Sequence, residues 1–151
     1  MSTAGTQVRP HRQVGTGLVL PFMPPVGRHW PAWGGRFIGI IGDAALILGP
    51  LCPVELDWQA TDTWARSLRV GAHTDFQLPG LIELQIIARA MPDLFAACVH
   101  RIWTCDPAPG VPQDAMTLDL ITGTGAMHWG RRFNCFAVAV RRQPLNWRSR
   151  T

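Results

Sequence analysis

The residues best suited to metal binding or catalysis in this 151-residue chain are its cysteines and histidines. Cys98, His100 and Cys105 lie close together in sequence. In a strand, Cys98 and His100 would share a face without Cys105, whereas in a helix Cys98 and Cys105 would share a face without His100. Structural zinc requires about four ligands at tight spacing. We therefore expect no metal site here, and we interpret these residues as core cysteines beside an exposed histidine.

A nucleophilic site could in principle be assembled from Cys135, His128 and Asp119. No glycine-flanked elbow or other local signature surrounds any of the three, as nucleophilic catalysis usually requires. The glycine-bearing segments match neither the Walker pattern nor GxGxxG, and the chain contains no lysine that could meet a phosphate. We therefore expect a protein that is not an enzyme, with no catalytic residue and no cofactor.

The arginine-rich ends of the chain are the strongest candidate for a binding function. All ten acidic residues lie between Asp43 and Asp119, so both ends carry only arginine as a fixed charge. Arginine pairs bidentately with anions and stacks on aromatic rings. The candidate partner- or nucleic-acid-binding residues are Arg9, Arg12, Arg131, Arg132, Arg141, Arg142, Trp147, Arg148 and Arg150.

Three interpretations of these basic ends remain open from the sequence. Arginines interleaved with tryptophans have the ingredients for neutralising a nucleic-acid backbone and stacking on its bases. The same ends could dock on the acidic middle of a neighbouring copy, or they could be solvated tails without a partner. Sequence alone does not choose between protein, DNA or RNA, and no partner.

The stretch Leu81–Cys105 is the one on which the other elements are expected to pack. Its first part, Leu81–Ala90, places apolar residues mainly on one parity, which predicts a strand. Its second part, Leu94–Cys105, has apolar residues at helical spacing after Pro92 and Asp93, which favours a helix beginning there. A second strand, with the Met91–Asp93 segment as a hairpin turn, is the alternative for this part.

The remaining periodicity is mostly that of strands. Gly42-Asp43 between two apolar runs predicts a hairpin, and Thr61–Val70 predicts a helix with Thr61 as its N-cap. Further strands are expected at Gly17–Met23, Pro53–Trp58, Met116–Thr122 and Arg132–Arg142. On Arg132–Arg142, small residues alternate with larger apolar ones, as if layers pressed on both faces.

These elements predict a mainly β protein, an antiparallel β-sandwich or a partly closed barrel with one or two short helices and extended termini. An α+β fold is the alternative. We expect residues 1–16 to form a flexible arm, residues 17–142 a single β-rich domain, and residues 143–151 a basic tail.

The sequence also bears on where in the cell the protein is expected. The N-terminus lacks the apolar core of a secretory signal, and the apolar stretch Phe37–Val54 is interrupted by Asp43, Pro50 and Pro53. We therefore expect a cytoplasmic or virion protein that does not bind membranes and keeps its cysteines reduced.

Arms around a β body, few catalytic groups and opposite charges on ends and middle favour a structural role. We expect a non-enzymatic assembly subunit of a larger particle, such as a phage or virus capsid or tail, whose partners are identical copies or other subunits. The alternative is a nucleic-acid-binding protein that uses its arginine- and tryptophan-rich termini.

Overall fold

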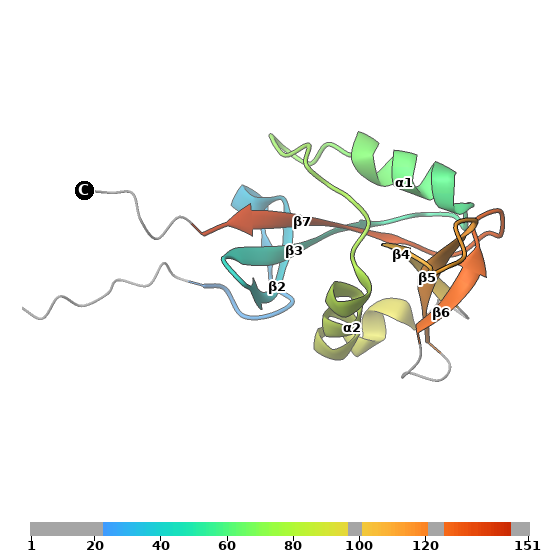
Figure 1. The fold of residues 1–151 in the computed structure, drawn as a ribbon. Helices are drawn as coiled ribbons and strands as arrows, with labels where there is room; N and C mark the ends of the chain where they lie inside the picture. Colours follow the sequence, from blue (N-terminus) through green and yellow to red (C-terminus); the bar gives the residue numbers. More distant parts are fainter. Residues whose placement is uncertain (1–22, 97–100, 121–125, 146–151) are drawn as a thin grey trace, which may run out of the picture.

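Two antiparallel sheets and two α-helices make up the described part of the chain (Figure 1). The structure is a computed structural model that describes residues 23–96, 101–120 and 126–145, without the side chains of residues 126–129. The strands are β1 (His29–Trp30), β2 (Gly35–Ile41), β3 (Ala44–Leu51), β4 (Arg101–Pro107), β5 (Asp114–Asp119), β6 (Ala126–Gly130) and β7 (Val138–Pro144). The helices are α1 (Trp58–Ser67), α2 (Leu81–Ala90) and two 3-10 turns, η1 (Pro31–Trp33) and η2 (Pro92–Phe95).

The four-stranded sheet has the order β1-β2-β3-β7 and is built around a hairpin. Ile41 pairs with Ala44, so the connection between β2 and β3 is the two-residue turn Gly42-Asp43. Gly42 has a φ of 61°, and no other type of residue in the described chain has a positive φ, which is the combination of a type II′ turn. The hairpin predicted from Gly42-Asp43 is therefore confirmed.

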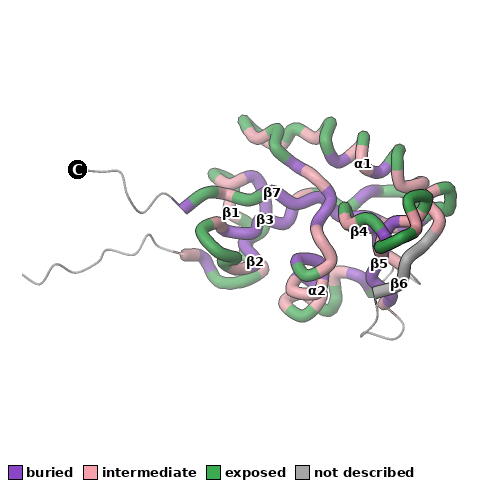
Figure 2. Tube along the Cα trace, viewed as in Figure 1, coloured by how far each residue is buried: buried purple, intermediate pink, exposed green. Residues whose placement is uncertain are grey.

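β7 runs antiparallel to β3 and is buried on both faces. Val138 and Val140 face the core beneath α2, whereas Ala137 and Ala139 face the core beneath α1. Figure 2 shows the resulting concentration of buried positions along β3 and β7, with the segment leading to α2 crossing them. The small and large residues that alternate here were expected to mark two close layers, and the packing confirms this.

Helix α1 begins earlier than the sequence suggested. Asp57, not Thr61, is the N-cap, because its Oδ1 accepts a hydrogen bond of 2.8 Å from the Ala60 backbone N–H. Thr61 is fully buried and its hydroxyl donates to the Asp57 carbonyl at 2.7 Å. The predicted helix is thus confirmed, but its predicted cap is wrong, and helix replaces the end of the strand expected at Pro53–Trp58. Only an isolated bridge between Leu56 and Cys135 remains of that strand.

The stretch Leu81–Ala90 is the helix α2, so the strand predicted there is wrong. Leu84 and Ile87 are fully buried, and Leu81, Ala88 and Met91 pack beside them at helical spacing. Ile82, which the strand interpretation placed on the dry face, has a 70% exposed side chain. The helix buries Glu83, and Arg142 on β7 supplies the positive charge that makes this burial favourable. A local sequence pattern cannot reveal a partner so distant in the chain.

The second sheet, of order β4-β5-β6, follows η2. The helix favoured for Leu94–Cys105 is confirmed only at its start, where η2 begins at Pro92, while β4 from Arg101 onward has the alternative strand conformation. A parallel bridge between Ile102 and Phe136, with a 2.9 Å hydrogen bond from the Trp103 N–H to the Phe136 carbonyl, connects this sheet to the chain entering β7. The strand expected at Met116–Thr122 is β5.

The mainly β fold with antiparallel sheets and two short helices is confirmed, and the described residues form two separate sheets, not a closed barrel. No helix within the described ranges is long and apolar enough to cross a bilayer. The expected arm, extended termini and residues 17–22 of the expected first strand lie outside the described residues. β7 continues through Gln143 and Pro144, which were expected in the tail.

Close approach of β2 and β3 gives a test of this sheet. A Cβ added at Gly35 would lie 2.2 Å from the Leu48 carbonyl oxygen, whereas nothing lies within 4 Å of a Cβ at Gly39 on the same strand. We predict that Gly35→Ala lowers the free energy of unfolding by about 3 kcal/mol, since backbone must move. Gly39→Ala should raise it by roughly 0.4–1 kcal/mol by restricting the unfolded chain. Urea unfolding of both variants checks this; equal effects would contradict the strand pairing.

Candidate functional site

Arg141, one of the predicted binding residues, is buried in its own chain. Its side chain is 5% exposed, and it donates to Asp75 at 2.7 Å and 3.3 Å and to the Trp33 carbonyl at 2.8 Å. The guanidinium thereby connects β7 to η1 and to the loop between α1 and α2. This arginine is positioned to hold the fold together and not to meet an external polyanion.

The pair between Arg141 and Asp75 changes the acidity of the carboxyl group. The hydrogen bond from Arg141 lowers the pKa of Asp75 below its ordinary value, and it outweighs partial burial, which acts to raise it. A depressed folded-state pKa means that the carboxylate form stabilises the folded protein.

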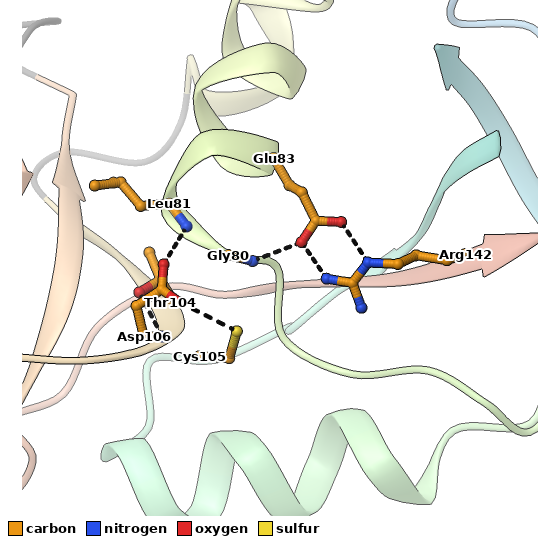
Figure 3. A network of polar contacts seen from close by, with 7 residues as sticks. All are labelled: Gly80, Leu81, Glu83, Thr104, Cys105, Asp106 and Arg142. Atoms are coloured by element: carbon orange, nitrogen blue, oxygen red, sulfur yellow. Dashed lines mark hydrogen bonds and ion pairs between the residues drawn. The ribbon is translucent and has the colours of Figure 1, made fainter. Parts of the chain in front are cut away.

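Arg142, the next residue, points to the opposite face of β7, because side chains alternate along a strand. Its guanidinium donates two hydrogen bonds to the Glu83 carboxylate, from Nη2 and, at 2.8 Å, from Nε. Glu83 is 8% exposed, and its Oε1 also accepts from the Gly80 backbone N–H at 2.9 Å. Figure 3 shows this carboxylate lying between the first turn of α2 and β7.

A second carboxylate completes the start of α2 from a distant strand. Asp106 of β4 accepts a 2.7 Å hydrogen bond from the Leu81 backbone N–H, and the Asp106 N–H is itself bonded to Thr104 (Figure 3). The carboxylates of Glu83 and Asp106 therefore lie at the positive end of the α2 dipole, and this interaction stabilises the helix and the negative charges. The network is structural: its hydrogen-bonding groups are used in holding α2 against β4 and β7.

The cysteines beside these groups are kept as thiols. The Cys105 Sγ lies 3.9 Å from Asp106, and burial, followed by the charges of Asp106 and Glu83, raises its pKa. Burial raises the pKa of Cys135 to about 12. Since the thiolate is the nucleophile, neither cysteine is activated for nucleophilic chemistry at neutral pH. The site considered for Cys135, His128 and Asp119 thus has an inert cysteine, and the His128 side chain lies outside the described residues.

The other described members of the basic set lie on the β5–β6 side of the molecule. Arg131 lies over the Trp58 ring at 4.3 Å, and its Nε donates to the Asp114 carbonyl at 3.2 Å. Arg132 is exposed and lies over the Phe133 ring at 5.4 Å. These two arginines are not brought together with Arg141 and Arg142, which are committed to ion pairs at the other end of the same chain segment.

The remaining candidates cannot be placed. Arg9, Arg12, Trp147, Arg148 and Arg150 lie outside the described residues, as do the metal candidates Cys98 and His100. Among the residues that are described, no three His, Cys, Asp or Glu side chains gather where they could hold a metal ion.

The end of the β2–β3 hairpin is the surface that sequence reasoning missed. β1 pairs only with Gly35 and Arg36, so β2 continues past its short neighbour. Ile40 and Ile41, on opposite faces of that continuation, are 48% and 37% exposed. The sequence contained a sign of this surface. Apolar residues stand on both parities at the end of the hairpin, and the single core-facing side of a strand cannot bury both sets.

Both ends of the described chain lie against this hairpin. Met23 and Leu145 pack with Phe37, Ala45 and Ile47 in one apolar cluster, and the Leu145 N–H donates to the Asp43 carbonyl at 2.9 Å. The first and last described residues of the chain therefore both lie at the hairpin end of the body (Figure 1).

No protein-family model matches the chain, and a comparison with curated proteins finds no similar sequence.

The Arg141–Asp75 pair predicts a specific pH dependence. Its stabilisation is present above the unfolded-state Asp pKa of about 3.9 and is lost as the pH falls through the lower folded-state value. We predict that Asp75→Asn lowers the free energy of unfolding by about 2 kcal/mol at neutral pH, a figure reduced for the exposure of Asp75, and that this difference shrinks in acid. Urea unfolding across pH measures it. Asp93→Asn, on exposed η2, is the control, and a pH-independent difference for Asp75→Asn would contradict the pair.

The Arg142–Glu83 pair can be tested by a double-mutant cycle. Arg142→Met keeps the length of the side chain but leaves Glu83 buried without its cation, and we expect a cost of about 2 kcal/mol. Adding Glu83→Gln should recover at least about 1 kcal/mol as coupling energy. The matched control is Arg66→Met, whose guanidinium is 65% exposed in an i,i+4 pair with Asp62 and should contribute less than about 0.5 kcal/mol. Equal costs for Arg142→Met and Arg66→Met would disprove the role of the network.

Proposed function

We propose that this protein is a non-enzymatic structural subunit that associates with copies of itself through the end of its β2–β3 hairpin. The observation that carries the proposal is the exposure of Ile40 and Ile41 on a strand that continues past its two-residue neighbour. Large apolar side chains gathered at a sheet edge favour association, because the edge also offers backbone groups to a second strand.

Natural edge strands are usually protected by charges, prolines or β-bulges. The backbone of Phe37 is already bonded to Gly27 and Arg28, and a β-bulge follows it, but residues 38–41 read IGII and contain neither a charge nor a proline. Two copies of β2 placed antiparallel across a twofold axis would extend one sheet through both subunits, an isologous contact in which each copy presents the same surface.

The chain ends support assembly beyond a dimer. Met23 and Leu145, the two ends of the described chain, both pack against the hairpin, so residues 1–22 and 146–151 join the described body there. These segments carry Arg9, Arg12, Arg148 and Arg150, and the middle of the chain is acidic. Charge complementarity between copies would then add to the apolar contact, as in a particle such as a phage or virus shell or tail.

Nucleic-acid binding is the less favoured of the two functions. Arg141 and Arg142 were among its expected contacts, and both already hold carboxylates of their own chain. Releasing them would leave Asp75 and Glu83 without their cations, at a cost in stability that a phosphate contact must first offset.

The test is the mass of the protein in solution over a range of concentrations, by sedimentation or light scattering. We expect an oligomer that the double variant Ile40→Lys/Ile41→Lys weakens by at least about a hundredfold in Kd, since two apolar side chains lose their burial and two charges are introduced. Ile82→Lys is the matched control, because Ile82 is more exposed than either residue and lies on α2, outside the hairpin strands.

All three side chains face solvent, so thermal unfolding should be nearly the same in each variant, which separates loss of assembly from loss of fold. A wild-type protein that stays monomeric at every concentration, or an Ile82→Lys variant that dissociates as readily as the hairpin variant, would refute the proposal.

A further inference from the structure

A pocket of about 220 Å³ lies where the start of β2 meets the end of β3. Its base is a row of three residues in register across three strands, because His29 pairs with Arg36 and Arg36 pairs with Leu48. Residues opposite one another in neighbouring strands point to the same face, so the imidazole, the guanidinium and the leucine side chain lie side by side.

The remaining walls are apolar and come from separate parts of the chain. Leu94 of η2 closes one side, Val70 of the loop after α1 closes another, and Leu51 stands at the end of β3. The 3-10 turn that supplies Leu94 also packs on the core beneath α2 through Phe95. The walls are therefore fixed by the fold, as a ligand pocket requires.

The pocket is positively charged, and no acidic residue in its lining neutralises this charge. Arg36 and His29 are its ionisable residues, and none of the lining residues is acidic. Arg36 uses its Nη1 for a 2.9 Å hydrogen bond to the Gly27 carbonyl, which fixes the side chain. A guanidinium has five N–H donors, so an arginine held in this way can still form a bidentate pair with a carboxylate.

We propose that this pocket binds a small organic carboxylate with a compact apolar body about the size of one ring. The volume equals that of roughly seven water molecules and lies below the usual range for drug-sized ligands, so the pocket suits a group of about one ring. The carboxylate pairs with Arg36 beside His29, and the apolar body lies against Leu51, Val70 and Leu94. Self-association at Ile40 and Ile41 is not needed for this site.

The probe is benzoate, with benzamide as its neutral counterpart of the same shape. Titration of the full chain followed by NMR chemical shifts or calorimetry should show binding of benzoate that saturates, with benzamide bound at least about tenfold more weakly, because it loses the charge-assisted pair. Equal affinity for the two molecules would show that no cation in the pocket recognises the carboxylate and would overturn the proposal.

Variants separate this site from general attraction to a basic protein. Arg36→Gln, at an exposed position, should weaken benzoate at least about tenfold, and Leu51→Trp should block it by filling the pocket. Arg89→Gln removes the same charge from the exposed surface of α2 and should leave the affinity unchanged. Absence of saturable binding by wild-type protein, or equal losses in Arg36→Gln and Arg89→Gln, would exclude the site.

Discussion

The consecutive arginines at the end of β7 are the contact on which the arrangement of the layers depends. Adjacent residues of a strand point to opposite faces, so Arg141 holds the α1 side of the sheet through Asp75 while Arg142 holds α2 through Glu83. A slip of one residue in the pairing with β3 would send each guanidinium to the wrong side. The two ion pairs therefore specify register as well as adding stability, and they do so for the strand that both apolar cores share.

Local patterns predicted the elements whose causes are local. The hairpin follows from a turn that only a glycine-containing pair supports, and α1 follows from spacing and a nearby cap, although the cap was misplaced from Asp57 to Thr61. The alternating small and large residues of β7 were enough to predict two covering layers. In each case the decisive interaction joins residues a few positions apart.

The failures involve partners distant in sequence. The parity of the apolar residues in Leu81–Ala90 predicted a strand, but the segment is a helix whose Glu83 is buried, and the residue that makes this burial acceptable is Arg142. The Leu81 N–H at the start of the same helix is capped by Asp106. A glutamate three residues after Gly80 was the one local sign of this helix start. The uneven charge of the sequence was recognised, but two of its complementary pairs form within one chain, where contacts between copies had been expected.

Some reactive or charged groups of the described residues already have partners within the chain, and others are open to solvent. The thiols are protonated or buried, and the carboxylates at the α2 terminus hold backbone and arginine. The accessible groups include apolar side chains at the hairpin end and a cation at the start of β2.

Pairing of β3 with β7 also bears on the order in which the chain is made. β3 leaves the ribosome well before β7, the last strand described, so the β3–β7 pair that completes the four-stranded sheet forms only after everything between them has been synthesised. Until then, the apolar faces of the β2–β3 hairpin have no sheet partner and are open to other chains. Contacts that join such distant residues form slowly. The hairpin is therefore the part of this fold whose apolar residues wait longest for their last strand.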